Sequence, residues 1–289
     1  MDVNAQTGIP PATTVGPVRL TVSDLTRSRS FYERVLGLEA EERGAGIVSL
    51  RAGGTALVEL REDASASRID HGAPGLYHFA VLMPDRRALA VALARAAAAR
   101  WPLSGASDHL VSEALYLSDP DGIGIEIYRD RPRREWTYQD GQLAMSTLPL
   151  DLDDLITEIA ANGELEPQAP PGTHMGHIHL QVSDLEAAEE FYSRVLGFEV
   201  TVRGYPGALF VSAGGYHHHI GLNTWNSRGA RPRDPGGVGL DWFEIVVPGG
   251  EELEPIVARV QAANLDIGQS NGGWTTADPA GNRLLLRPA

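Results

Sequence analysis

One stretch of this sequence occurs twice. The motif Val22-Ser-Asp-Leu25 with the following Phe31-Tyr-Glu-Arg-Val-Leu-Gly37 returns, 160 residues later, as Val182-Ser-Asp-Leu185 with Phe191-Tyr-Ser-Arg-Val-Leu-Gly197. A weaker relation joins two further pairs of segments, 75–79 with 239–243 and 119–122 with 278–281. Internal repeats of this kind mark repeated structural units. The chain is therefore expected to contain four related units, of two kinds in alternation.

Each unit is predicted to begin with a strand, continue with a helix and end with further strands. In the first unit, apolar residues alternate over 18–22, and Asp24 is a favourable helix N-cap. Apolar residues then follow helical spacing from Leu25 to Leu36 and stop at a glycine. Short β-rich runs follow at 47–50 and 56–60. The third unit repeats this order, with a strand at 178–182, a cap at Asp184, a helix at 185–196 and strands at 208–211 and 218–222.

The second and fourth units carry longer predicted helices, at 85–98 and 251–263. The sequence thus predicts an α+β fold of four βαβββ units in two domains. The units lie at 15–62, 75–130, 175–224 and 238–288. Residues 1–14 are expected to be a flexible tail. Residues 131–172 are expected to be a linker, rich in proline at both ends, with one helix at 153–161.

Composition excludes several classes of function. The 289 residues are 43% hydrophobic and 21% charged, which is typical of a globular protein. The net charge of −14 argues against binding to nucleic acid or to an anionic membrane surface. Because there is no cysteine, disulfides, thiolate zinc sites and cysteine nucleophiles are excluded. No signal peptide and no apolar run of membrane-spanning length is found, so we expect a cytoplasmic protein.

Histidine is distributed unevenly. All nine histidines lie between His71 and His219, in or next to the two middle units. Histidine is the commonest metal ligand and titrates near neutral pH, so this grouping indicates a site. The competing interpretation is that the run His217-His218-His219 merely inflates the count.

The repeat pattern resembles a known superfamily. Val182-Ser-Asp-Leu-Glu-Ala-Ala-Glu-Glu-Phe-Tyr-Ser-Arg-Val-Leu-Gly-Phe198, together with the paired Asp-Pro-x-Gly turns, is similar to the vicinal oxygen chelate superfamily. That group contains glyoxalases, fosfomycin-resistance enzymes, bleomycin-binding proteins and extradiol ring-cleaving dioxygenases. The resemblance implies that pairs of βαβββ units form half-barrels, whose concave face holds a divalent metal.

A segment of the second unit looks like the signature of the extradiol dioxygenases. His109, Tyr116, the turn Asp119–Gly122 and Glu126 follow one another in the order of that signature, and Ser107 is a small departure from it. The residues agree with the match, since Tyr116 and Glu126 lie on two predicted strands joined by the turn. A carboxylate on the inward face of a strand needs a partner, and a metal would be one. The alternatives are that Glu126 faces solvent and that Tyr116 is a plain core tyrosine.

The resemblance implies three metal ligands. His78 occupies the place of a first-strand ligand, and Glu126 is the carboxylate ligand. The third ligand should stand seven residues before the helix cap of a partner unit, which is Pro17 in the first unit and His177 in the third. The fourth unit has Trp242 and Leu285 where the second has His78 and Glu126. Two histidines and one carboxylate form the facial triad of non-haem Fe(II) oxygenases, with three open coordination positions.

Further roles follow from the same resemblance. Strand alternation aligns His218 with an acid–base histidine, with His217 or His219 as a one-residue error, and the other two histidines are expected on an exposed edge strand. His109 and Tyr116 would assist ring opening. His179 shares a strand face with His177 and is a candidate to contact the ligands. Glyoxalase-type sites carry a fourth ligand on a strand where this chain has Gly221.

The function favoured by the sequence is an Fe(II)-dependent extradiol dioxygenase of the catechol 2,3-dioxygenase type. Its substrates would be a small catechol or hydroquinone and O2, and Mn(II) or another divalent metal is an alternative to iron. Two other functions stay open: a Mn(II)- or Zn(II)-dependent lyase, isomerase or thiol transferase, and a metal-free protein that binds a small molecule such as an antibiotic. Edge-rich half-barrels commonly associate, so a homo-oligomer is also an open expectation.

The split of the ligands between units makes a prediction about architecture. His78 and Glu126 belong to the second unit and His177 to the third, so one site can hold all three only if these two units share a half-barrel. The first and fourth units would then pair separately. The second and third units could share a half-barrel either within one chain or across a dimer, and both arrangements would bring the three ligands together.

Overall fold

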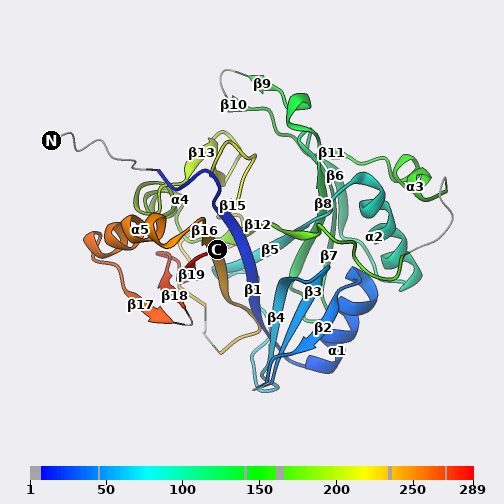
Figure 1. The fold of residues 1–289 in the computed structure, drawn as a ribbon, viewed down its shortest axis with the longest axis horizontal. Coiled ribbons are helices and arrows are strands. Elements are labelled where there is room, and N and C mark those ends of the chain that lie inside the picture. Colours follow the sequence, from blue (N-terminus) through cyan, green and yellow to red (C-terminus); the bar gives the residue numbers. More distant parts are fainter. Residues whose placement is uncertain (1–7, 45, 140–141, 161–165, 234–235, 271) are drawn as a thin grey trace.

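The computed structural model describes residues 8–44, 46–139, 142–160, 166–233, 236–270 and 272–289. The chain forms four βαβββ units that build two curled sheets, with the helices on the outside (Figure 1). This confirms the predicted α+β fold. Within the described residues, no helix is long and apolar enough to cross a membrane.

The first unit consists of β1 (Thr14–Val22), α1 (Leu25–Phe31), the π-helical turn η1 (Tyr32–Leu36), β2 (Glu39–Glu42), β3 (Ile47–Ala52) and β4 (Thr55–Glu62). The second consists of β5 (Gly75–Leu82), α2 (Arg86–Ala98), β6 (Gly105–Asp108), β7 (Ser112–Ser118) and β8 (Gly124–Asp130).

The third unit consists of β12 (His174–Gln181), α4 (Leu185–Glu189), the π-helical turn η3 (Glu190–Val195), β13 (Glu199–Val202), β14 (Ala208–Ser212) and β15 (Ile220–Asn223). The fourth consists of β16 (Gly239–Val247), α5 (Gly250–Ala262), β17 (Ile267–Ser270), β18 (Gly273–Ala277) and β19 (Arg283–Pro288).

The segment between the second and third units is more ordered than a plain linker. It contains the 3-10 turn η2 (Arg133–Glu135), the short strands β9 (Tyr138–Gln139), β10 (Gln142–Leu143) and β11 (Leu148–Pro149), and the predicted helix as α3 (Leu152–Ala160). β11 pairs with β6 and so extends a sheet of the main body. Of the N-terminal segment, Ile9 is buried and its backbone N–H donates to the carbonyl of Gly197.

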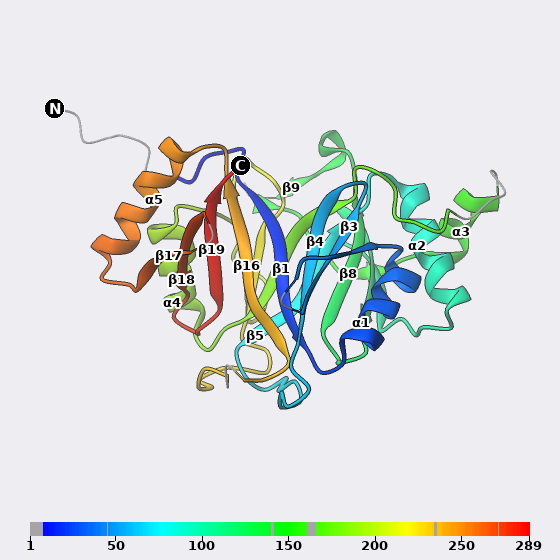
Figure 2. The same cartoon turned by 60° about the horizontal axis from the view of Figure 1, so that its bottom comes forward.

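Strand order settles how the units pair. One sheet runs β17-β18-β19-β16-β1-β4-β3-β2 and combines the fourth and first units, several of whose strands lie side by side in Figure 2. The other runs β11-β6-β7-β8-β5-β12-β15-β14-β13 and combines the second and third units. The predicted crossed pairing is therefore confirmed, and it occurs within one chain.

The helices begin where the sequence predicts. The carboxylate of Asp24 accepts a hydrogen bond from the backbone N–H of Arg27, and that of Asp184 accepts from Glu186 and Ala187. These caps satisfy N–H groups that a helix leaves free at its first turn. The π-helical turn η1, which continues α1, ends before Gly37, whose φ of +73° lies in the left-handed region that glycine adopts most readily.

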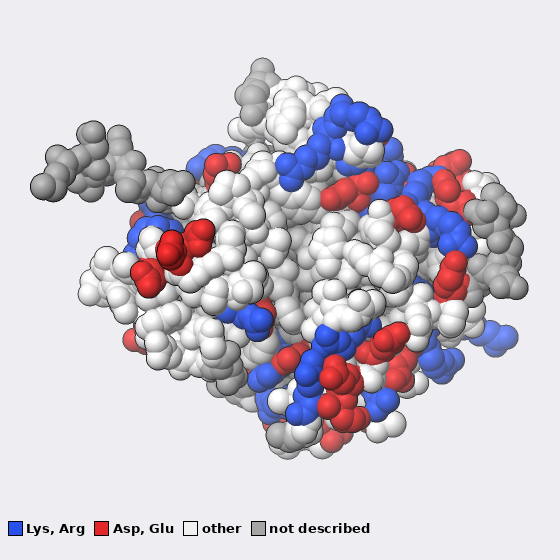
Figure 3. Space-filling view, viewed as in Figure 1, with Lys and Arg blue, Asp and Glu red and all other residues white. Residues whose placement is uncertain are grey.

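The helices of consecutive units meet although their sheets do not pair. α2 packs on η1, and α5 packs on η3, where the guanidinium of Arg259 donates to the carbonyls of Val195 and Leu196. Consecutive units are thus joined through helices and crossed units through sheets. On the described part of the face shown in Figure 3, acidic and basic side chains lie intermixed, without a wide basic surface.

Candidate metal centre

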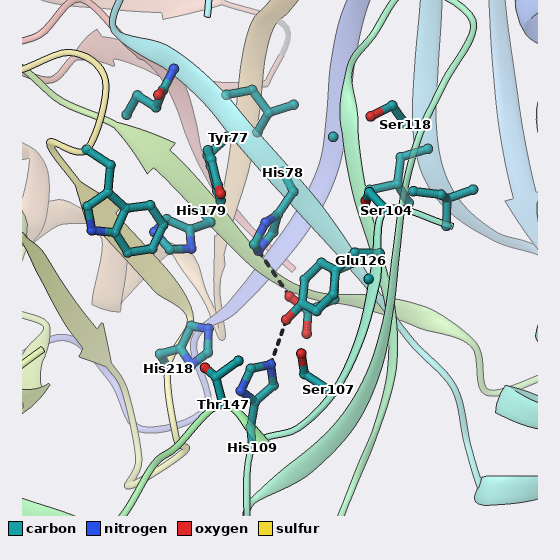
Figure 4. Close-up of a pocket in the computed structure, with 18 of the residues that line it drawn as sticks. Tyr77, His78, Ser104, Ser107, His109, Ser118, Glu126, Thr147, His179 and His218 are labelled. Atoms are coloured by element: carbon teal, nitrogen blue, oxygen red, sulfur yellow. Dashed lines mark hydrogen bonds and ion pairs between the residues drawn. The ribbon is translucent and has the colours of Figure 1, made fainter. Parts of the chain in front are cut away.

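The three predicted ligands come together on neighbouring strands. His78 lies on β5, Glu126 on β8 and His177 on β12, which are adjacent in the order β8-β5-β12. Their ligand atoms all lie within 4.8 Å of one another. The Nε2 atoms of His78 and His177 are 3.0 and 3.1 Å from the same oxygen, Oε2 of Glu126. Figure 4 shows His78 pointing toward Glu126.

Sheet register explains this convergence. Ala80 of β5 lies opposite His177 on one side and opposite Glu126 on the other, so the three form one row across the strands. His78 stands two residues from Ala80, and residues at that spacing point to the same face of a sheet. Because Ala80 has a small side chain, the longer side chains of the row can meet above it.

The protonation states of Glu126 and His177 favour the binding of a cation. Burial works to raise the pKa of the Glu126 carboxyl, but its contacts with His177 and His78 outweigh this and hold the pKa well below its usual range. Burial lowers the pKa of His177 to about 4. An ionised carboxylate beside a neutral imidazole is the state in which these groups bind a metal.

The donor set also fits a divalent metal in its geometry. Ligand atoms about 2.1 Å from one ion, and at right angles to each other, lie about 3 Å apart. The distances of 3.0 and 3.1 Å between Glu126 and the two imidazoles match this spacing. In addition, Nε2 of His78 is buried and makes no hydrogen bond of good geometry within the described residues. Two histidines and one carboxylate can therefore hold a first-row divalent ion and leave coordination positions open.

The histidine run differs from its prediction. His217, His218 and His219 precede β15, which begins at Ile220, so strand alternation does not apply to them. All three are buried, which corrects the expectation that two would lie on an exposed edge strand. Among the three, His218 lines the cavity beside the triad, and its ring centroid is 4.1 Å from that of His177.

A polar network that the sequence did not indicate lies behind His218. Nδ1 of His218 is 2.7 Å from Nδ1 of His217, and Nε2 of His217 is 3.0 Å from the carboxylate of Asp130. The hydroxyl of Tyr216 donates to the same carboxylate over 3.2 Å. These bonds occupy Nδ1 of His218, so its Nε2 is the nitrogen left for a ligand in the cavity.

His109 and Tyr116 form a hydrogen-bonded pair. Nε2 of His109 is 2.7 Å from the hydroxyl of Tyr116, and Nδ1 is 2.7 Å from the carbonyl of Ser146. Because a carbonyl only accepts, Nδ1 must carry hydrogen, and Nε2 of a neutral imidazole then accepts from Tyr116. Tyr116 lies directly opposite Glu126 in the sheet, and burial raises the pKa of its phenol well above 10. Ser146 belongs to the predicted linker, so that segment helps to position His109.

His179 takes up the space beside Gly221. The two residues are partners in the register of β12 and β15, and a Cβ on Gly221 would lie 2.9 Å from the imidazole. The ring of His179 is 4.9 Å from that of His78. The imidazole of His179, from the neighbouring strand, therefore fills the space beside Gly221 and packs beside the triad.

A cavity of about 550 Å³ is lined by several of these groups: His78, His109, Tyr116, Glu126, His179 and His218. Sequence reasoning did not find most of its wall, since aromatic residues there come from loops and strands distant in sequence and carry no motif. Three linker residues also line it. The wall not predicted from the sequence includes Tyr77, Tyr205, Phe210, Trp225, Met145, Ser146 and Thr147.

In the other sheet, the positions that correspond to His78 and His179 are occupied by Trp242 and Arg19. Arg19 lies opposite Trp242 in register, as His179 lies opposite His78. Its guanidinium lies 4.7 Å from the centre of the Trp242 ring and forms an ion pair of 2.6 Å with Glu59. These units carry Pro17, Trp242 and Leu285 at the corresponding positions, and no group of potential metal ligands is found there among the described residues.

Comparison with known proteins agrees with this architecture. The family model of the Glyoxalase/Bleomycin resistance protein/Dioxygenase superfamily matches residues 14–127 and 174–285. A catechol-2,3-dioxygenase of Bacillus subtilis is 44% identical over 284 residues, which cover 96% of this chain and 98% of that protein.

Solved structures share the fold at low sequence identity. Glyoxalase I from Zea mays superposes with a TM-score of 0.59 at 15% identity, covering 95% of this chain and 92% of that one. The CppA protein of Streptococcus pneumoniae gives a TM-score of 0.60 at 10% identity, covering 96% and 100%. At such identities the likeness concerns the fold alone.

Proposed function

The chain belongs to the Glyoxalase/Bleomycin resistance protein/Dioxygenase superfamily, and from this premise we propose that it is an extradiol dioxygenase. It would hold one Fe(II) on His78, Glu126 and His177 and open the ring of a small catechol or hydroquinone with O2. The observation that carries the proposal is the convergence of these three side chains, from two units, beside a cavity that His78 and Glu126 line. The identity of 44% to a catechol-2,3-dioxygenase supports an enzyme of this type.

The protein supplies the metal's ligands and leaves room for the substrate. A bound Fe(II) supplies Lewis acidity toward the diol and redox activity toward O2. The glycine at position 221, backed by His179, adds no ligand from β15, so three protein ligands leave positions for both substrates. This is the feature that favours a dioxygenase over a glyoxalase-like lyase, isomerase or thiol transferase.

His218 is proposed as the acid–base group. It lines the cavity beside His177, and its Nδ1 is held by His217. Its Nε2 would accept a proton from a substrate hydroxyl and return it later in the reaction. A positioned acid–base group of this kind contributes about 10²–10⁴-fold to the rate.

His109 and Tyr116 are proposed to assist ring opening. The phenol of Tyr116 stays protonated, because burial raises its pKa well above 10, and so it can donate a hydrogen bond. The carbonyl of Ser146 fixes the orientation of His109. A substrate held at the triad would share its cavity with both His218 and this pair. The cytoplasmic setting expected from the sequence stays part of the proposal.

Anaerobic loading with Fe(II), followed by catechol and air, tests the proposal. We expect one metal ion per chain and the absorbance of a yellow ring-opened product, with neither metal nor product in a Glu126→Ala variant. An iron-loaded protein that binds catechol and forms no ring-opened product would overturn the assignment. Activity with Mn(II) or Zn(II) in a lyase or thiol-transfer assay would then favour the second function. A purified protein that takes up no metal would favour the metal-free binding protein.

A further inference from the structure

The cavity is much larger than a single catechol ring requires. Its volume of about 550 Å³ lies in the range of roughly 300–1,000 Å³ that drug-sized ligands occupy. Besides Tyr116, four large aromatic side chains line it, which are Tyr77, Tyr205, Phe210 and Trp225. An aromatic wall of this size can bury a second ring or an apolar chain.

The aromatic wall runs from the metal ligands to the surface. The ring of His179 is 4.9 Å from that of His78, and the indole of Trp225 is 5.5 Å from that of His179. Tyr77 lies 5.3 Å from Trp225, edge to face, and Figure 4 shows Tyr77 near His179 and His78. Tyr77 and Trp225 are 39% and 42% exposed, so they stand at the mouth of the cavity.

The same cavity offers no Lys or Arg side chain to an anionic substituent among the described residues, and its one carboxylate is Glu126. The polar groups at one end are engaged with each other: the Gln181 amide donates to the carbonyls of His71 and Ala73, and Asn226 donates to Gln181. A carboxylate moved into this space would lose its hydration without a cationic partner. The net charge of −14 repels anions at longer range as well.

We propose that the preferred substrate is an uncharged catechol with a bulky apolar or aromatic substituent, and that Trp225 determines this specificity by packing against the substituent. The inference rests on the proposed function and deepens it. The diol end of the substrate would lie at the triad, and the substituent would extend along His179 toward Tyr77 and Trp225. Aromatic stacking adds about 0.5–1.5 kcal/mol to the gain from area burial.

Binding to the zinc-loaded protein tests this inference without turnover, because Zn(II) is not redox-active. Affinities of 3-phenylcatechol, catechol and 3,4-dihydroxybenzoate would be measured by calorimetry. We expect 3-phenylcatechol to bind at least about tenfold more tightly than catechol, and 3,4-dihydroxybenzoate to bind more weakly than catechol. Equal affinity for the phenyl and the carboxylate compounds would overturn the proposal.

Variants at position 225 test whether Trp225 causes the preference for 3-phenylcatechol. Trp225→Ala should lower the affinity for 3-phenylcatechol at least about tenfold more than it lowers that for catechol, and Trp225→Phe should retain most of the preference. Trp274→Ala, which removes a tryptophan of β18 remote from the cavity, should change neither affinity. Equal losses for both diols in Trp225→Ala would overturn the role of this residue.

The outcomes also separate this inference from the proposed function. A zinc-loaded protein that binds none of the three diols would overturn both. An iron-loaded protein that cleaves catechol, while its zinc form shows no preference for 3-phenylcatechol, would overturn the substrate class alone.

Discussion

The imidazole of His179 fills the space that a side chain at Gly221 would occupy. A Cβ on Gly221 would lie between 2.9 and 3.1 Å from three atoms of this ring. The ring in turn lies 4.9 Å from that of the predicted ligand His78. The absence of a side chain at position 221 therefore affects the triad through His179.

Gly221→Ala should weaken metal binding. The added methyl group would push His179 toward His78, and disturbance of groups that support a ligand costs about 10–100-fold in metal affinity. Metal titration measures the effect. Gly268→Ala, at an exposed strand glycine whose nearest atom to a new Cβ is 4.0 Å away, is the matched control. Unchanged affinity in Gly221→Ala would contradict this account.

Glu126→Gln should abolish metal binding in practice. Loss of groups that merely support ligands costs about 10–100-fold, so loss of the single carboxylate ligand should cost more. Metal content of the purified variant, together with calorimetric titration, checks this. Glu244→Gln changes a buried carboxylate of β16 in the other sheet and should leave metal binding as in the wild type. Metal retained by Glu126→Gln would remove this residue from the ligand set.

His218→Ala should keep its metal and lose about 10²–10⁴-fold in turnover. The ring lines the cavity, whereas His217 and His219 do not. Turnover of the iron-loaded variant, normalised to its metal content, is the measurement. His219→Ala is the comparison, because Nδ1 of His219 bonds to Ser212 and Ala213, away from the cavity. Normal turnover in His218→Ala, with loss in His217→Ala or His219→Ala, would assign the acid–base role to a neighbour.

Asp119 should make stability depend on pH. Burial raises the pKa of its carboxyl to about 7, from an ordinary value of 3.8. Between these values the folded protein holds a proton that the unfolded chain releases, so the free energy of unfolding falls as pH rises. The slope is at most about 1.4 kcal/mol per pH unit for one group.

Asp119→Asn should remove this part of the slope, since the amide oxygen can still accept from the N–H groups of Asp121 and Ile123. Denaturant unfolding of the metal-free proteins between pH 4 and 8 measures this effect. The free energy of unfolding of the variant should rise relative to that of the wild type as pH rises. Burial also raises the pKa of Asp278, the equivalent residue of the fourth unit. In a variant with both aspartates changed to asparagine, the free energy of unfolding should therefore depend even less on pH. Parallel profiles of the wild type and Asp119→Asn would contradict the prediction.

Much of the fold could be predicted from local patterns. Alternation in 18–22 and 178–182 and the caps Asp24 and Asp184 gave strands and helices close to their observed bounds, because strand pairing and capping act over a few residues. The crossed pairing of units followed from the placement of potential ligands, with Pro17 in the first unit and His177 in the third. That inference is confirmed by the strand order.

The conformation of the histidine run could not be predicted in the same way. Alternation would place His218 on a strand, yet β15 begins only at Ile220. The run is held in a bend by side-chain contacts to residues such as Asp130 and Ser212, which lie in other strands. Local spacing carries no information about such contacts.

The sequence by itself determined the four units, the residue types at the triad and the pairing of units that brings them together. These depend on periodicity and on which positions can carry a ligand. Only the tertiary structure decided that His218 faces the cavity, that Ser146 holds His109, that His179 fills the space beside Gly221 and that aromatic side chains line the cavity. The physical reason is that these contacts join segments far apart in the chain, and their partners are chosen by how curled sheets and loops pack rather than by any local pattern.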